Sequence, residues 1–236
     1  MTNSSKFFIA LVSATALVVL AMAIANADWQ NPVQFGIMLV ITLVASRLKV
    51  TLPGLEGNLS VNLPFLLIAA VQFGAAEAAV LALFSTLVQS ISAPMSGRKL
   101  VQMQFNCATI VLATAAAGMA YSFTSGWFAD RDSFPMIAAA AAYLIVNVGL
   151  VSTIIGLGDD RSVLGTVGQV FTLSFPHFVL AAGVAYMITS TENMSWHGLV
   201  ALLPIMFFVY RSYRRYFATR ANNVAIMPMH SAAAAD

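Results

Sequence analysis

Charged residues are scarce in this chain. Lysine, arginine, aspartate and glutamate together make up 8% of its 236 residues, against about 25% in an ordinary soluble domain. Hydrophobic residues make up 60% of the sequence, and so few charges could not cover that much apolar surface in a soluble fold of this length. The composition therefore excludes a soluble globular protein and predicts a membrane protein.

The chain also lacks the residue groups on which most enzymes and metalloproteins depend. Its single cysteine, Cys107, excludes an internal disulfide framework and a cysteine-only zinc site. The sequence contains no HExxH motif, no phosphate-binding loop, no paired carboxylates and no nucleophile with a base nearby. The net charge is only +2, which makes nucleic acid a poor partner. We therefore expect no catalytic residues, no cofactor and no bound metal.

Long apolar runs fill most of the sequence. A helix needs roughly 20 apolar residues to cross the hydrocarbon core of a bilayer, and the runs form about seven to eight such segments. They are Phe7–Ala27, Val33–Ser46, Asn62–Gly74, Ala75–Ser92, Leu100–Thr124, Met136–Leu157, Leu164–Thr189 and Trp196–Tyr216. The sequence thus predicts an all-α, polytopic transmembrane helix bundle over residues 1–217 and a short cytoplasmic tail over residues 218–236.

The basic residues predict an orientation for this bundle. Ten of them fall in the gaps between alternate pairs of apolar runs, and Arg131 alone falls on the other side. The ten are Lys6, Arg47, Lys49, Arg98, Lys99, Arg161, Arg211, Arg214, Arg215 and Arg220. Because basic residues near span ends are retained in the cytoplasm, we expect both termini to be cytoplasmic. The last four arginines are expected to meet anionic lipid headgroups.

Two places leave the number of segments open. The first run begins after Lys6. We expect an uncleaved helix here, because the run is long for a signal peptide; a cleaved signal peptide is the alternative. Residues 50–63, VTLPGLEGNLSVNL, break the helical pattern and end in apolar and polar residues that alternate, which predicts a short extended piece or hairpin. The short helix that follows, over residues 62–74, either crosses the bilayer or forms a re-entrant pair with residues 75–92.

Polar residues inside apolar runs are costly in a membrane, so each is a functional candidate. Arg98, Gln102 and Asn106 stand at i, i+4 and i+8 and share one helical face. In the functional alternative, that face lines a cavity for a ligand that is anionic or carries an amide. In the structural alternative, Arg98 extends to the membrane surface and Asn106 bonds a neighbouring helix. The remaining candidates for ligand binding are Gln72, Asn147 and His177.

Three further features of the apolar runs carry alternatives. His177 follows Pro176, which is expected to kink its helix, and is either a ligand or proton carrier or a hydrogen-bonded packing residue. Glu77 is predicted at the outer boundary of the membrane, where it can stay hydrated. Small residues are expected to let helices pack closely inside the bundle, or else to offer a docking face to a partner. These small residues are Ala10, Ala14, Ala113, Ala116 and Ala117.

Residues 58–91 and 98–106 carry a family resemblance. The run NLSVNLPFLLIAAVQFGAAEAAVLALFSTLVQSI, followed by Arg98 and Asn106 and later by YRSYRRYF, resembles the multi-span N-terminal membrane module of bacterial GGDEF and HD-GYP receptors. More distantly, it is similar to the S-components of energy-coupling-factor transporters, whose small-residue docking motif would correspond to Ala10 and Ala14. The chain ends where such a receptor would begin its output domain, so the resemblance implies no cyclic-nucleotide chemistry. It also lacks the acidic residue expected after the paired helices of many S-components, with Gln89 near that place.

These observations predict a non-catalytic protein of the bacterial inner membrane. The leading hypothesis is a sensor-like, ligand-binding membrane module that acts through another membrane or cytoplasmic protein, with a small molecule as ligand. The alternative is the substrate-binding subunit of a transporter. A membrane-embedded enzyme is the least favoured hypothesis.

Overall fold

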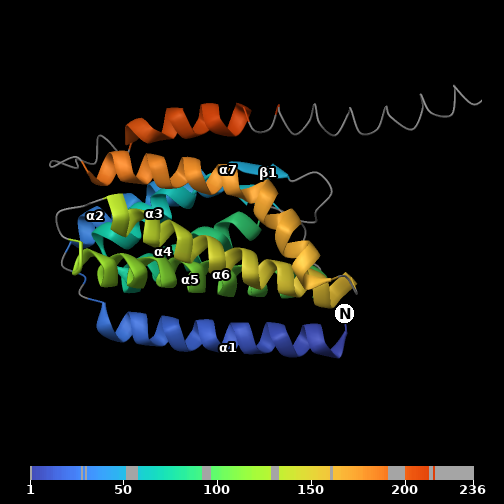
Figure 1. Ribbon diagram of the computed structural model, residues 1–236. Coiled ribbons are helices and arrows are strands. Elements are labelled where there is room, and N and C mark those ends of the chain that lie inside the picture. The colour runs from blue at the N-terminus through green and yellow to red at the C-terminus, as the bar shows by residue number, and fades with distance from the viewer. Residues whose placement is uncertain are drawn as a thin grey trace, which may run out of the picture.

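The chain forms a bundle of helices in a computed structural model (Figure 1). The structure describes residues 2–27, 29, 31–51, 58–91, 97–128, 133–159, 162–190, 200–212 and 215. Its elements are α1 (Asn3–Asn26), α2 (Pro32–Ser46), β1 (Lys49–Thr51), β2 (Asn58–Ser60), α3 (Leu63–Gln72), α4 (Ala75–Ser90), α5 (Gly97–Ser125), α6 (Ser133–Asp159), α7 (Val163–Thr189) and the helix Val200–Ser212. Apart from one small hairpin the described part is helical, which confirms the predicted all-α bundle.

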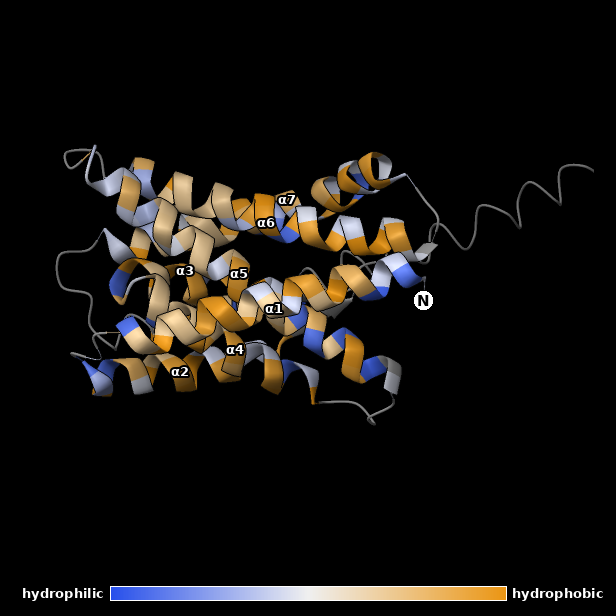
Figure 2. Cartoon of the chain, turned by 90° about the horizontal axis from the view of Figure 1, so that it is seen from below, coloured by the Kyte–Doolittle hydropathy of each residue, from blue (hydrophilic) through white to orange (hydrophobic). Residues whose placement is uncertain are grey.

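The outer surface of the bundle is that of a membrane protein. Four helices, α1, α5, α6 and α7, are long and apolar enough to cross a bilayer, and the other four are shorter but apolar. Large hydrophobic side chains face outwards, with Phe7 at 72% and Ile145 at 69% exposed. Figure 2 shows hydrophobic residues along the helices and hydrophilic residues mainly towards their ends. Such exposed apolar side chains are stable when they contact lipid.

The segment between α2 and α3 is the predicted hairpin. β1 and β2 pair in antiparallel register, with Val50 opposite Leu59, and the Val61 amide donates to the Leu48 carbonyl at 3.2 Å. α3 then has ten residues, which is about 15 Å of helix and half of the roughly 30 Å hydrocarbon core. Because α3 is too short to cross the bilayer, the structure favours the re-entrant alternative for α3 and α4.

α3 forms the centre of the bundle. Every residue from 61 to 70 is buried, and Phe65 and Ile68 have no exposed surface. α3 packs against α2, α4, α5, α6 and α7. A helix that is apolar on all sides must be enclosed by other helices or by lipid, and here the longer helices enclose it.

The turn after α3 brings α4 close to α5. Gly74 begins this turn with φ of 91°, a conformation that glycine adopts without strain. α4 then packs so closely on α5 that a Cβ atom added at Gly118 would lie 2.6 Å from the Ala75 Cα atom. Only glycine at position 118 permits this approach.

The bundle has two ends, which we name after α1. At the Asn3 end, the Ser5 hydroxyl donates to the Leu157 carbonyl of α6 at 3.0 Å. At the Asn26 end, α4 and α5 meet at Ala75 and Gly118. The helix Val200–Ser212 runs beside α7 and points back towards the Asn3 end (Figure 1).

Candidate functional site

The candidate site lies on α5, at the depth where α3 begins. α4 and α5 are antiparallel neighbours that touch at Ala75 and Gly118. Ser85 lies ten residues from Ala75, and Thr109 lies nine residues from Gly118, so both are about 14 to 15 Å from that contact at 1.5 Å per residue. Ser85 and Thr109 therefore lie at nearly the same depth in the bundle.

A buried hydrogen bond fixes the start of α3 at this depth too. The Asn62 side chain donates from Nδ2 to the Ser85 hydroxyl at 3.3 Å, and Asn62 is only 5% exposed. α3 runs from this point to the Asn26 end. The other half of α5, towards the Asn3 end, therefore has no α3 beside it.

One side of α5 changes character at the same depth. Ala113 and Ala117 on this side have no exposed surface. Asn106, seven residues before Ala113, lies on the same side after almost two full turns but is exposed, as is Gln102 one turn earlier. The side of α5 that is packed in the half near the Asn26 end is thus open in the half near the Asn3 end.

Gln104 shows how a polar residue on α5 behaves when it serves packing. Its Nε2 atom donates to the Ser13 hydroxyl of α1 at 3.0 Å, and the neighbouring Phe105 ring lies 6.2 Å from the Phe8 ring of α1. Asn106 is two residues from Gln104, or roughly 200° around the helix, so it points away from α1.

Gln102 and Asn106 lack such a link. Within the described residues, no hydrogen bond joins either amide to another group. An amide has both donors and an acceptor, and leaving it unpaired at membrane depth is costly. These two side chains therefore have hydrogen-bonding capacity that the described fold does not use.

Thr109 extends this polar side into the bundle. It follows Gln102 and Asn106 at the i, i+4, i+7 spacing of one helical stripe. Its side chain is 1% exposed, and its Oγ1 atom has no hydrogen-bond partner within the described residues. We name Gln102, Asn106 and Thr109 the α5 polar stripe. It begins at exposed amides and ends at a buried, unsatisfied hydroxyl at the depth of Asn62.

The sequence identified two of these three residues. Thr109 was missed because a lone threonine in an apolar run is ordinary, although its spacing from Asn106 was a usable signal. Arg98 begins the same face in the sequence, and the structure describes only its backbone, at the start of α5.

The other candidate residues lie elsewhere. Asn147 is half-buried on α6 and forms a side-chain hydrogen bond with Tyr143. The Tyr143 ring lies 5.6 Å from the Phe178 ring of α7, and Phe178 follows His177, which is 5% exposed. Asn147 and His177 thus belong to one polar and aromatic group between α6 and α7. Gln72 is exposed at the last turn of α3, about 15 Å along α3 from Asn62.

Glu77 corrects an expectation. The sequence placed it at a hydrated boundary, but its side chain is only 7% exposed. Glu77 is the third residue of α4, and its Oε2 atom lies 3.9 Å from a Cβ atom built at Gly74. A glutamate that folds back over the first turn of its own helix stabilises the unpaired amides there.

The small residues also divide into two groups. Ala113 and Ala117 are fully buried, which confirms that they pack inside the bundle. Ala10 and Ala14 of α1 are exposed, so the expectation of packing inside the bundle is wrong for these two.

The α5 polar stripe can form hydrogen bonds but lacks the groups for catalysis. It contains two amides and one hydroxyl, and none of these is an acid, a base or an activated nucleophile near pH 7. Among the residues that the structure describes, no group of three histidine, cysteine, aspartate or glutamate side chains could hold a metal ion. The stripe is therefore suited to binding a polar group rather than to transforming it.

Comparisons with protein-family models, with curated proteins and with solved structures find no match to this chain.

Proposed function

We propose that this protein is a non-catalytic, sensor-like membrane module that binds a small polar ligand at the α5 polar stripe and acts through a partner protein. The observation that carries the proposal is the contrast on α5 between Gln104 and Asn106. Both side chains are exposed, but Gln104 is bonded to Ser13 of α1, whereas Asn106 has no hydrogen-bond partner among the described residues. A ligand that carries an amide, hydroxyl or carboxylate group would satisfy Asn106, Gln102 and the Thr109 hydroxyl together.

The position of the stripe supports a role in signalling. Broken helices that end inside the membrane are common where membrane proteins bind ligands, and α3 begins at the depth of Thr109. α3 packs on both α5 and α7, so a ligand that reaches Thr109 would lie at the depth where α3 begins. The short helix Val200–Ser212 follows α7 in the chain, and a shift of α7 could reach a partner protein through it.

The test compares two variants on opposite sides of α5. Purified wild-type protein, Asn106→Leu and Gln104→Leu are screened by thermal shift against a panel of amino acids, nucleobases and small carboxylates. The proposal predicts that at least one compound stabilises the wild-type protein and Gln104→Leu but not Asn106→Leu. If the compounds that stabilise the wild-type protein stabilise Asn106→Leu equally, the stripe is not the binding site.

The proposed location is the bacterial inner membrane with both termini in the cytoplasm, supported by the distribution of basic residues. Reporters fused after Ala235 and within residues 124–133 should report opposite sides of the membrane. A periplasmic signal from the fusion at Ala235 would contradict this orientation.

One observation favours a second candidate, the substrate-binding subunit of a transporter. Ala10 and Ala14 lie exposed on α1, and small residues on an exposed face allow another helix to approach closely. Replacing both by Trp would block such a contact without disturbing the buried side of α1. Loss of a co-purifying transporter ATPase in this variant would favour the transporter, whereas an unchanged signalling partner would favour the sensor.

A further inference from the structure

The last described helix carries a stripe that changes from apolar to cationic along its length. Phe208, Arg211, Ser212 and Arg215 stand at i, i+3, i+4 and i+7, so their side chains share one face. They line an open hollow of about 430 Å³. This hollow has an aromatic ring at one end and two guanidinium groups with a hydroxyl at the other.

The other residues of the helix show whether this stripe faces the bundle or points away from it. Leu202 and Met206 are 4% and 1% exposed and pack towards the bundle. Ile205 and Phe208 are 52% and 68% exposed and continue the stripe away from the two arginines. In a membrane-spanning bundle an exposed apolar stripe of this kind contacts lipid chains.

The hollow carries two basic side chains, Arg211 and Arg215, beside the Ser212 hydroxyl. Arg211 and Arg215 line the same hollow, and guanidinium groups bind phosphate oxygens in a bidentate manner. The Ser212 hydroxyl, on the same face, can donate a further hydrogen bond.

We propose that Phe208, Arg211, Ser212 and Arg215 form a binding site for one phospholipid with a net negative headgroup. The two arginines and Ser212 hold the phosphate, and the acyl chains lie along Phe208 and Ile205. The order of the residues matches the order of groups in a phospholipid, with the charged group at the membrane surface and the apolar chains below it. The site is independent of the α5 polar stripe and would make the last helix responsive to lipid composition.

The probes are phosphatidylglycerol, phosphatidylcholine and inorganic phosphate, and bound lipids are counted by native mass spectrometry of the full-length protein. Arg211→Gln/Arg215→Gln should weaken phosphatidylglycerol binding about 30-fold, which corresponds to about 1 kcal/mol for each arginine. The control Lys6→Gln/Lys99→Gln removes the same charge from other exposed positions and should leave this binding unchanged. Phosphatidylcholine should bind more weakly than phosphatidylglycerol to the wild-type protein.

Two further variants distinguish a bound lipid from diffuse charge attraction and from free phosphate. Arg211→Lys/Arg215→Lys keeps the charge but loses bidentate geometry, so it should retain part of the affinity and also report on folding. Phe208→Ser should weaken binding of the lipid. Equal losses of phosphatidylglycerol affinity in Arg211→Gln/Arg215→Gln and in the lysine control would overturn the site, because diffuse charge attraction would then explain the binding. Displacement of phosphatidylglycerol by millimolar inorganic phosphate would show that the ligand is free phosphate rather than lipid.

Discussion

The two halves of α5 differ in how they use the same helix. Towards the Asn26 end, the small residues Ala113, Ala117 and Gly118 allow neighbouring helices to approach until no surface remains exposed on Ala113 and Ala117. Towards the Asn3 end, Asn106 and Gln102 lie on the same side as these alanines and remain exposed. The packed half of α5 therefore contributes to the stability of the bundle, whereas the amides of the other half have hydrogen-bonding capacity that the described fold does not use.

The strongest test of the packed half is Gly118→Ala. The added Cβ atom would lie 2.6 Å from the Ala75 Cα atom and 2.9 Å from its backbone nitrogen, and backbone cannot move away as a flexible side chain can. We expect a loss of about 1 to 3 kcal/mol, as for overpacked cores. Thermal unfolding in detergent measures it.

The matched control is Gly149→Ala on α6, where nothing lies within 4 Å of an added Cβ atom. Alanine should leave stability unchanged there or raise it by up to about 1 kcal/mol. If both glycine variants unfold at the same temperature, α4 and α5 do not pack as closely as described.

Loss of the Asn62–Ser85 hydrogen bond, at the boundary between the two halves, should cause the next largest loss of stability. Asn62→Ala removes the donor to Ser85, and an interhelical hydrogen bond in a membrane is worth about 0.6 to 2 kcal/mol. Ser85 would keep its bond to the Ala82 carbonyl, so no buried hydroxyl is left unpaired. A double-mutant cycle with Ser85→Ala isolates the pair, and a coupling energy of zero would show that Asn62 does not fix the start of α3.

A direct comparison of the two polar residues sharpens the contrast on α5. Gln104→Leu loses the bond to Ser13 and should lower stability by about 0.6 to 1.7 kcal/mol. Asn106→Leu loses no bond within the described part of the chain and should leave stability unchanged or raise it. Thermal unfolding of the two variants in the same detergent shows which is less stable. A larger loss of stability for Asn106→Leu than for Gln104→Leu would mean that Asn106 serves packing.

Thr109→Val should give the smallest change in stability. Its Oγ1 atom is buried without a hydrogen-bond partner in the described part of the structure, and removing such a group is neutral or stabilising. We expect a shift of at most about 1 kcal/mol towards higher stability, with loss of ligand-induced stabilisation. A clear loss of stability without ligand would show that the hydroxyl is bonded in the membrane.

The fold was largely predictable because bilayer thickness sets the length of an apolar run. The second segment was expected from Val33, and α2 begins one residue earlier, at Pro32. The extended piece expected before Leu63 includes the hairpin strand Asn58–Ser60. The centre of the bundle was less predictable, because an apolar run alone does not show whether a short helix such as α3 is enclosed by protein or crosses the lipid.

The site was predictable only in part. Helical periodicity places Gln102 and Asn106 on one face, but only the position of α3 shows that this face is open near Asn106 and closed near Ala113. The burial of Glu77 depends on the turn at Gly74 and on packing between distant segments, and no local pattern encodes that packing. Exposure of Ala10 and Ala14 likewise follows from which side of α1 meets α5, a choice that small residues do not determine.

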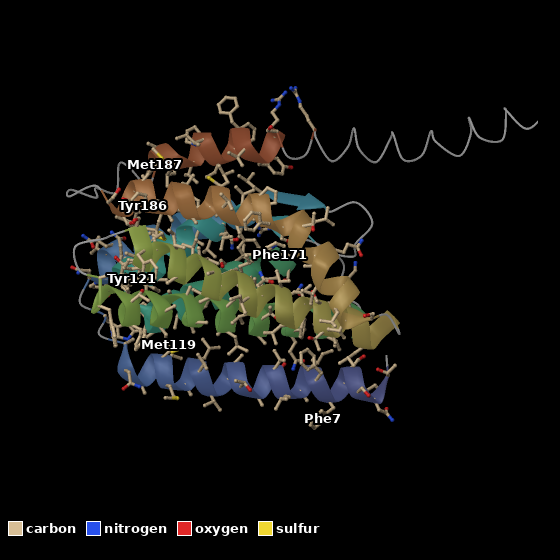
Figure 3. All side chains as sticks on the ribbon, in the orientation of Figure 1. Phe7, Met119, Tyr121, Phe171, Tyr186 and Met187 are labelled. Atoms are coloured by element: carbon tan, nitrogen blue, oxygen red, sulfur yellow. The ribbon has the colours of Figure 1, made fainter. Side chains whose placement is uncertain are left out.

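The central claim is that a polar ligand can reach the α5 polar stripe. The most direct measurement of it is the reactivity of single cysteines with a charged, membrane-impermeant thiol reagent. In a Cys107→Ala background, Asn106→Cys is compared with Ala113→Cys, and with Leu11→Cys on the outer side of α1. Leu11 is 53% exposed and lies one turn from Phe7, which points away from the bundle (Figure 3). Leu11 is also as far from the start of α1 as Asn106 is from the start of α5, to within one residue.

If the exposed half of α5 is accessible to water from the Asn3 end of the bundle, Asn106→Cys should react with a reagent added at that end. Ala113→Cys, which is buried, and Leu11→Cys, which faces lipid, should stay unreactive under the same conditions. If Asn106→Cys is as unreactive as Leu11→Cys, the exposed half of α5 faces lipid, and the ligand-binding role of the stripe is contradicted.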